Sequence, residues 1–416
     1  MARILLHTLV FAPDGVSTSQ LLSELAQDLR AHGHKIVILT TTPHYNRDVD
    51  AEAKQPLKRH LFGLYYTSNH HGIRVIHTLM PRKGEQMSGR FSHYILFHIL
   101  SLILGTFLIG RQDVVIAPSP PLTIGVIGWM LALLKGGKFI YNVRELYPAL
   151  MVQMGMLSEQ SMFYRLLKRM EWFVYAASWR VVTITDMFTQ HVIAQGIKPE
   201  KVLTIPDFVD TEFIQPCPKD NPLARQLGLV DKYVVLYAGN IGMTQSFDTI
   251  TEVLRRLTDV PEIHFLIVGD GARRSYVEAQ IAEKKLKNVT LLPYQPRHVV
   301  PDIYATGDVS LVPLMAGTAK TTIPSKIYTI MASGRPALVS VDLDSELVSI
   351  VEGSKCGLAV PPDDAEALEN GIRQMFAQRD TFHEYGMNGR RYIEQHFSRQ
   401  AVNDQFDQLL QHLKQP

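Results

Sequence analysis

The feature that most constrains the fold is a strand, a helix and a second strand, predicted within the first 40 residues. Residues 3–9 and 35–40 are apolar runs typical of buried strands, and leucines recur at helical spacing in residues 18–31 before Gly33. Two strands joined through a helix favour a parallel sheet. Further apolar runs of the same kind follow at residues 73–78, 113–117, 138–143 and 180–184.

Residues 211–231 interrupt this pattern, because they are rich in Pro, Asp and Asn and have no long hydrophobic period. We interpret them as a linker. A second series of strands alternating with helices comes next, at residues 233–237, 264–268, 289–292, 309–313, 336–341 and 358–360. The sequence therefore predicts an α/β fold with two Rossmann-like, doubly wound parallel-sheet domains that face a cleft, and ligands at the carboxyl ends of the strands.

Composition excludes several classes of protein. The formal net charge of +2 is too small for a typical nucleic-acid binder. Cys217 and Cys356 are far apart and give neither a disulfide framework nor a metal-binding pattern, which fits a reducing cytoplasm. Residues 2–9 contain one basic residue and precede a loop signal at Pro13, so we predict a first strand instead of a signal peptide.

The apolar run at residues 91–110 has the length of a membrane span, which needs about 20 residues. We predict that it does not cross, because it lies between two strands of one predicted sheet. Two alternatives remain: a buried helix, or a helix whose outer side enters a membrane surface. Basic residues that could accompany such a surface are Arg82, Lys83, Arg90, Arg165, Lys168 and Arg169.

Glycine-rich loops follow several of the predicted strands. In the second domain, Gly239, Asn240, Gly242 and Gln245 lie between a strand and a helix, an arrangement that can aim backbone N–H groups at a phosphate. The alternative is an ordinary tight turn. Two other strand ends allow the same two interpretations: Gly15 with Val16, and Gly269 with Asp270, where Asp270 could instead cap the next helix.

Two charged segments lie at the ends of predicted elements. Pro324 and Ser325 open a helix that places Lys326 in its first turn, where the helix dipole disfavours a cation. A lysine there favours a bound anion, and the alternative is a solvated side chain. Arg144 and Glu145 end a strand and would face the predicted cleft; the alternative is a surface salt bridge.

The sequence gives no convincing metal or nicotinamide site. Asp342 and Asp344 have the spacing of a metal–diphosphate site, but so short a pattern often occurs by chance. The sixteen histidines show no helical pairing with a carboxylate. We therefore expect neither a metal ion nor a cofactor.

Together these motifs resemble the retaining glycosyltransferases of family 4, which have the GT-B fold. The resemblance covers nearly the whole chain. Within the family, it extends to bacterial enzymes of surface-polysaccharide synthesis, of the fucosamine and colanic-acid type. It is carried by Tyr237-Ala-Gly-Asn-Ile-Gly-Met-Thr-Gln245, by Arg144-Glu-Leu-Tyr-Pro148 and by Pro324-Ser-Lys326.

The resemblance implies a division of labour. An N-terminal domain (residues 1–205) would bind the acceptor, a C-terminal domain (206–395) would bind the nucleotide sugar, and a last helix (396–416) would pack back on the first domain. The donor would contact Gly15, Val16, the 239–245 loop, Ser325 and Lys326, and its base would lie near Gly269, Asp270, Tyr294 and Gln295. Arg144 and Glu145 would lie near the acceptor. Transfer would retain the anomeric configuration without a metal, through same-face displacement.

The chain also departs from the family pattern. Asn240 and Gln245 replace the Arg and Lys of many members, and the paired glutamates fall on Thr321 and Thr329. The histidine that many members carry falls on Arg144. The second glutamate usually holds the ribose, so Thr329 bears on donor identity.

We therefore expect a cytoplasmic enzyme, peripheral on the inner face of the cell membrane, that moves a sugar from a UDP-linked donor to a lipid-linked or polysaccharide acceptor. One alternative is a GT-B-fold UDP-sugar epimerase. Another is a non-catalytic subunit that binds sugar nucleotides.

Overall fold

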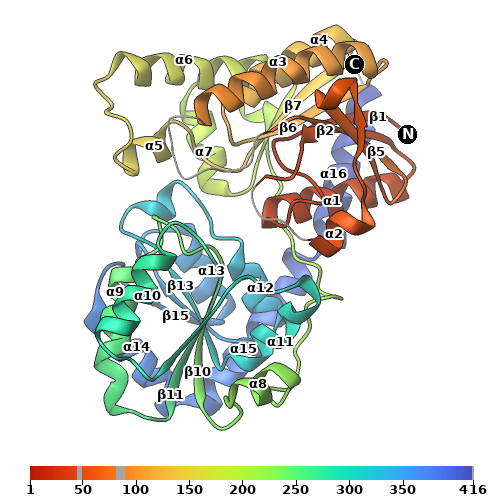
Figure 1. The fold of residues 1–416 in the computed structure, drawn as a ribbon. Coiled ribbons are helices and arrows are strands. Elements are labelled where there is room, and N and C mark those ends of the chain that lie inside the picture. Colours follow the sequence, from red (N-terminus) through yellow and green to blue (C-terminus); the bar gives the residue numbers. More distant parts are fainter. Residues whose placement is uncertain (45–48, 81–89, 415–416) are drawn as a thin grey trace. The chain divides into compact units, whose positions relative to one another are not determined.

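The computed structural model describes residues 1–44, 49–80 and 90–414. The chain divides into two compact units (Figure 1). Unit 1 comprises Met1–Asp207 and Val402–Pro416, and unit 2 comprises Phe208–Ala401.

Unit 1 is built on a sheet of nine described strands in the order β3-β4-β5-β2-β1-β6-β7-β8-β9. Seven of them run parallel: β1 (Arg3–His7), β2 (Lys35–Thr41), β5 (Ile73–Thr78), β6 (Val114–Pro118), β7 (Lys138–Val143), β8 (Arg180–Thr183) and β9 (Val202–Thr204). The strands β3 (Lys58–His60), at the edge, and β4 (Tyr65–His70), beside it, pair antiparallel. The sequence did not predict these two strands, because neither contains an apolar run.

Helices cover both faces of this sheet. They are α1 (Ser17–Ala31), α2 (Val49–Lys54), α3 (Arg90–Leu108), α4 (Thr123–Lys135), α5 (Ala149–Gln153), α6 (Met162–Ala177), α7 (Asp186–Ala194) and α16 (Arg399–Gln411). The last of these returns to unit 1, where Asp407 Oδ1 lies 2.7 Å from His34 Nε2 and Asn403 hydrogen-bonds Asp28.

The apolar helix α3 lies between β5 and β6 in the chain, and both strands belong to one sheet, as predicted. Its inner side is buried through Phe97, Leu100 and Leu104, and it contacts α4, which in turn contacts α6. Figure 1 shows these three helices along one side of unit 1. No helix within the described ranges is both long and apolar enough to span a membrane.

Unit 2 has a fully parallel sheet in the order β12-β11-β10-β13-β14-β15. The strands are β10 (Tyr233–Ala238), β11 (Ile263–Val268), β12 (Val289–Leu292), β13 (Val309–Pro313), β14 (Ala337–Ser340) and β15 (Gly357–Val360). Alternate residues of β10 enter different cores: Val234 and Leu236 pack on one face, Val235 and Tyr237 on the other. Burial on both faces is the pattern of a doubly wound sheet, so the predicted fold class is confirmed.

The helices of unit 2 are α8 (Pro222–Leu227), α9 (Phe247–Arg256), α10 (Arg274–Glu283), α11 (Val300–Thr306), α12 (Lys326–Ala332), α13 (Glu346–Ser354), α14 (Ala365–Ala377) and α15 (Arg379–His396). The prediction of a linker at residues 211–231 was wrong, because α8 lies within this segment and packs on α11. Asn221 caps α8 and donates to the Thr306 hydroxyl at 3.1 Å.

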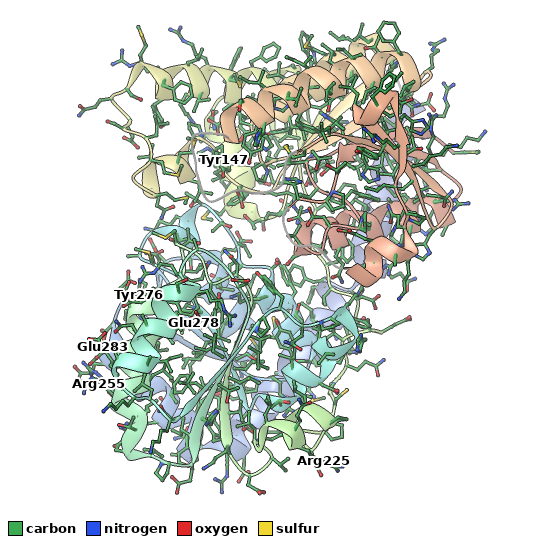
Figure 2. All side chains as sticks on the ribbon, viewed as in Figure 1. Tyr147, Arg225, Arg255, Tyr276, Glu278 and Glu283 are labelled. Carbon is green, nitrogen blue, oxygen red and sulfur yellow. The ribbon has the colours of Figure 1, made fainter. Side chains whose placement is uncertain are left out.

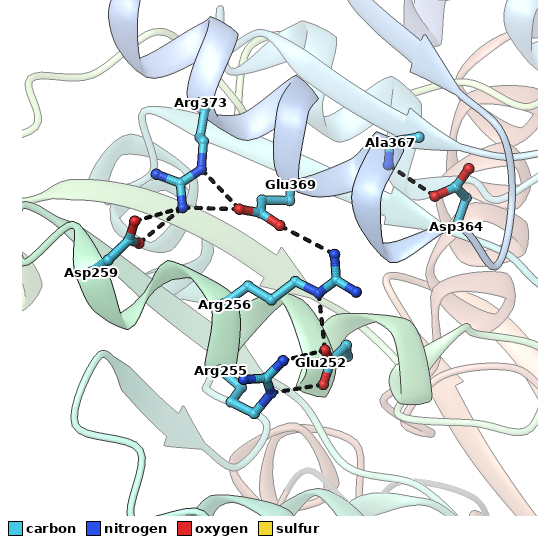
Figure 3. Close-up of polar contacts among 8 residues, drawn as sticks. All are labelled: Glu252, Arg255, Arg256, Asp259, Asp364, Ala367, Glu369 and Arg373. Atoms are coloured by element: carbon cyan, nitrogen blue, oxygen red, sulfur yellow. Dashed lines mark hydrogen bonds and ion pairs between the residues drawn. The ribbon is translucent and has the colours of Figure 1, made fainter.

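Ion pairs join α9 to α14 on the surface of unit 2 (Figure 3). The Arg256 guanidinium contacts Glu252 on its own helix at 2.9 Å and Glu369 on α14 at 3.4 Å. Arg373 bridges Glu369 and Asp259, both at 2.9 Å. This network fixes one side of the sheet whose carboxyl edge carries the candidate site.

Candidate active site

Two glycine-rich loops at the carboxyl edge of the unit 2 sheet pack directly on each other. The Gly239 N–H donates to the Val268 carbonyl at 2.9 Å, and the Ile241 N–H donates to the Asp270 carbonyl at 2.8 Å. A Cβ atom on Gly269 would lie 1.9 Å from the Gly239 carbonyl oxygen, and one on Gly271 would lie 2.4 Å from the Ile241 carbonyl oxygen. Gly269 and Gly271 are therefore required for loop packing, whatever ligand binds there.

Lys326 lies beside the first of these loops. Its ammonium is 3.8 Å from the centre of the Tyr237 ring, and a Cβ atom on Gly239 would lie 3.0 Å from Nζ. Within residues 1–44, 49–80 and 90–414, Lys326 has neither a hydrogen-bond acceptor nor a carboxylate partner. Burial lowers the pKa of Lys326 to about 7. Lys326 is therefore a partly exposed lysine that lies over an aromatic ring and has no carboxylate partner in the described part of the chain.

The rest of the 239–245 loop is closed by its own hydrogen bonds. Gln245 Oε1 accepts from the Gly242 N–H at 3.0 Å, the Tyr237 hydroxyl donates to the Asn240 carbonyl, and the Met315 N–H donates to the Thr244 carbonyl at 3.0 Å. The side chain of Asn240 is exposed. Asn240 and Gln245 contribute polar groups to this loop and no charge.

Carboxylates hold the neighbouring loop that follows β13. Asp363 Oδ2 accepts from the Ala316 N–H at 2.9 Å, and Asp342 Oδ1 accepts from the Gly317 N–H at 2.7 Å. Asp344 instead pairs with Lys320 at 2.8 Å. Asp342 and Asp344 are thus engaged with different partners, and the described residues contain no group of three metal-binding side chains.

The residues expected near the nucleotide base lie at the ends of β11 and β12. Asp270 Oδ1 accepts from the Gly271 N–H at 2.7 Å and does not cap α10, which begins at Arg274. Burial and the nearby charge of Asp270 raise the pKa of the partly exposed Tyr294. Gln295 Nε2 donates to the Pro293 carbonyl at 3.0 Å. Asp270 and Tyr294 are therefore neighbours, as a common base site would require.

Helix α12 brings Lys326 and Thr329 to one side, because residues three apart share a helix face. Ser325 precedes the helix, and its carbonyl accepts from the Tyr328 N–H at 3.1 Å. Burial raises the pKa of Tyr304, while a hydrogen bond between its phenol and Thr329 opposes that rise. Thr329 thus has Tyr304 as a partner, a contact that no local sequence pattern predicts.

In unit 1, Arg144 and Glu145 follow β7 at the carboxyl edge of the sheet. The Arg144 guanidinium donates to Asp207 Oδ2 at 2.7 Å, with 12% and 9% of the two side chains exposed. Arg144 therefore forms a salt bridge, as the alternative predicted, but the pair is largely buried. The backbone N–H groups of Arg144 and Glu145 donate to the Ser119 hydroxyl at 2.9 and 3.4 Å.

Glu145 is enclosed, and burial raises the pKa of its carboxyl group, although a hydrogen bond with Tyr147 and the charge of Arg144 oppose the rise. Tyr147 is labelled in Figure 2, where it lies in unit 1 near α5. Sequence reasoning missed Asp207 and Ser119, since neither is adjacent to Arg144 in the chain.

Gly15 and Val16 lie between β1 and α1, also at the carboxyl edge of the unit 1 sheet. Gly15 is exposed, and Val16 is the N-cap residue of α1, whose carbonyl accepts from the Gln20 N–H at 3.1 Å. The loop is anchored by Asp14, which accepts from the His44 N–H at 3.0 Å.

Two family models match the chain, and together they span most of it. Residues 18–213 match "Glycosyltransferase Family 4", and residues 221–392 match "Glycosyl transferases group 1". A colanic acid biosynthesis glycosyl transferase of Escherichia coli K12, WcaI, is 24% identical over 419 residues, covering 97% of this chain and 98% of that protein. The alpha-galactosylglucosyldiacylglycerol synthase of Streptococcus pneumoniae is 26% identical, covering 56% of this chain and 62% of the synthase.

Solved structures share the whole fold. Sucrose-phosphate synthase from Thermosynechococcus elongatus superposes with a TM-score of 0.76 at 19% identity, covering 99% of both chains. HepE of Anabaena, in complex with UDP-glucose, superposes with a TM-score of 0.74 at 16% identity, covering 99% of this chain and 100% of HepE. The superpositions show the GT-B fold, and the two family models confirm the resemblance predicted from the motifs: the chain is a glycosyltransferase whose residues 18–213 match family 4 and whose residues 221–392 match group 1.

Proposed function

We propose that this glycosyltransferase moves a sugar from a UDP-linked donor to a lipid-linked or polysaccharide acceptor of surface-polysaccharide synthesis. One observation carries the proposal: the Lys326 ammonium has no anionic partner in the described chain and lies beside the 239–245 loop. A half-buried cation without a counter-charge is destabilised by partial desolvation, and a bound anion would offset that cost. The diphosphate of a nucleotide sugar would do so.

Three similar proteins support the proposed substrate classes. HepE, which shares the fold, was crystallised with UDP-glucose, and WcaI is named for colanic acid biosynthesis. The synthase of Streptococcus pneumoniae is named for a diacylglycerol glycolipid, which makes a lipid-linked acceptor reasonable for this chain.

In the proposed reaction, unit 2 holds the donor and unit 1 holds the acceptor. The bond between the anomeric carbon and the diphosphate oxygen breaks, the acceptor oxygen bonds to that carbon on the same face, and a phosphate oxygen takes the acceptor proton. Lys326 stabilises the negative charge that develops on the leaving UDP. The N–H groups of Gly239 and Gly242 are held by Val268 and Gln245, so they do not add to this charge stabilisation. We propose that Gly15 and Val16 contact the donor through their backbone.

Arg144 has a different role in this proposal. Its charge is already offset by Asp207, so it positions Glu145 and does not neutralise the diphosphate. Glu145, with its raised pKa, can hydrogen-bond an acceptor hydroxyl. Transfer then needs no metal, since Lys326 supplies the positive charge and Asp342 and Asp344 are held by other partners.

We also propose that the enzyme works on the cytoplasmic face of a membrane. Exposed apolar side chains form an i, i+4 row on α3: Ile95, Ile99, Ile103 and Phe107. On α6, exposed Leu166 and Trp172 accompany the exposed Arg165 and Arg169. Lys168 is paired with the buried Glu171, whereas Arg82, Lys83 and the Arg90 side chain lie outside the described residues.

A thermal-shift screen with UDP-, GDP- and ADP-sugars tests the donor assignment, because a ligand of the folded state raises the melting temperature. We expect stabilisation by UDP-sugars and its loss in Lys326→Met. Lys320→Met is a matched control, since Lys320 is exposed and paired with Asp344. The absence of a shift with every nucleotide sugar would contradict the proposal.

A further inference from the structure

The turn between β3 and β4 displays apolar side chains on a strained backbone. Leu61 and Phe62 have positive φ angles of 41° and 56°, a region that L residues with bulky side chains rarely occupy. Phe62 is 98% exposed, and Leu61 and Leu64 beside it are 64% and 41% exposed. Residues held in such conformations concentrate at functional sites.

Neighbouring side chains hold this turn in place. The Arg59 guanidinium donates to the Phe62 carbonyl and lies against Gly63, where a Cβ atom would be 2.9 Å from Nε. The His60 ring stacks on Tyr65 with 4.8 Å between centroids. The exposure of Phe62 is therefore imposed by the fold of the hairpin.

The turn lies at the edge of unit 1 where the proposed substrate residues lie. β4 is antiparallel to β5, and Tyr65 pairs with Thr78, the last residue of β5. The turn before Tyr65 is thus at the carboxyl edge of the parallel strands, as are Gly15 and Arg144. The Leu79 N–H donates to the Leu64 carbonyl at 3.3 Å, which ties the turn to the segment leaving β5.

The sequence on either side of the turn carries charge of one sign. No Asp or Glu occurs from Ala53 to Gly84. Lys54, Lys58 and Arg59 are exposed close to the turn in sequence. Exposed apolar side chains flanked by cations suit the interface of an anionic bilayer, where the rings enter the headgroup region and the cations meet lipid phosphates.

We propose that the β3–β4 turn, residues 61–64, inserts Leu61 and Phe62 into the surface of an anionic bilayer. This contact is separate from the exposed apolar rows on α3 and α6. It rests on the proposed function and extends it, because it brings the carboxyl edge of the unit 1 sheet to the lipid headgroups. The sugar of a lipid-linked acceptor would then meet the enzyme at the membrane surface.

Co-sedimentation of the full chain with vesicles tests the proposal, using phosphatidylcholine with about one-third phosphatidylglycerol and phosphatidylcholine alone. The variant is Leu61→Asn with Phe62→Asn, because asparagine tolerates positive φ and the turn should keep its shape. We expect wild type to bind the anionic vesicles, and the variant to bind them about tenfold more weakly. Leu343→Asn serves as a matched control, because it removes a 54% exposed apolar side chain from unit 2, and it should bind the vesicles as wild type does.

Equal vesicle binding by wild type and the double variant would overturn the proposal, as would no binding by wild type. Self-association of wild type that the variant loses would overturn it too, in favour of a second copy as the occupant. UDP-sugar stabilisation is measured on the same samples. If it is absent while vesicle binding still depends on Phe62, the donor proposal fails and the membrane contact stands.

Discussion

The ammonium of Lys326 lies 3.8 Å from the centre of the Tyr237 ring, and Gly239 leaves the space that Nζ occupies. The contact joins the first turn of α12 to the end of β10. Tyr237 is itself fixed, because its buried ring packs on Phe247 and its hydroxyl donates to the Asn240 carbonyl. The cation is therefore held in a defined position before any ligand arrives.

Replacing Lys326 with Met should separate binding from stability. We expect affinity for a UDP-sugar to fall by about 10- to 150-fold, the effect of losing a charged hydrogen bond. The free energy of unfolding should stay the same or rise by about 1 kcal/mol, because a buried charge is removed. Calorimetric titration and urea unfolding of the same protein measure both. Near-normal turnover in this variant would show that Lys326 does not act in the site.

Donor affinity should depend on pH through Lys326. The pKa of Lys326 in the free protein is about 7 because of burial, and a bound diphosphate would raise it. Binding then takes up a proton above pH 7, so affinity should fall as the pH rises from 7 towards 9, by at most about tenfold per unit. Titrations in buffers of different ionisation enthalpy detect the proton, and an identical pH dependence in Lys326→Met would assign the effect to another group.

Two glycine substitutions should have opposite effects on unit 2. In Gly269→Ala the new Cβ would meet the Gly239 carbonyl oxygen at 1.9 Å, so the two loops must separate, and we expect a loss of about 3 kcal/mol of stability. In Gly353→Ala on α13 the new Cβ would meet nothing within 4 Å. Because alanine has the better helix propensity, the free energy of unfolding should rise by about 1 kcal/mol at most. Urea unfolding compares them, and a neutral Gly269→Ala would contradict the described loop contact.

Buried histidines should make unit 1 sensitive to acid. Burial lowers the pKa of His7 to about 3 and that of His77 to about 4, while the unfolded groups titrate near 6.5. Below pH 6.5 the unfolded chain binds protons that the folded histidines do not, so the unfolding free energy falls as the pH drops. Each group contributes a slope of up to about 1.4 kcal/mol per pH unit.

His7→Leu tests this expectation, because both His7 ring nitrogens are buried without a hydrogen-bond partner in the described structure. The His7 ring stacks on Phe97, and the charge of His98 lowers the pKa of His7 further. Unfolding of the variant between pH 6.5 and 5 should show a slope smaller by about 1 kcal/mol per pH unit. An unchanged slope would show that His7 does not carry the effect.

The sequence predicted the features that depend on local pattern. Buried parallel strands such as β10 are continuous apolar runs, and these revealed both sheets. The strand β4 was missed because Tyr65 to His70 is polar, although only two residues separate it from its partner β5. The partner of Arg144 could not be predicted for another reason, because Asp207 lies 63 positions away. The requirement for glycine at position 269 could not be predicted either, because it depends on where the fold places the Gly239 carbonyl.

The return of α16 to unit 1 makes that unit discontinuous in the chain. Asp407 and Asn403, which follow unit 2 in the chain, contact His34 and Asp28. During synthesis, residues 1–207 of unit 1 are therefore made first, but α16 joins them only after all of unit 2 has been made. Truncation after Ala401 would leave the contiguous unit 2 intact and would damage the unit that was made first.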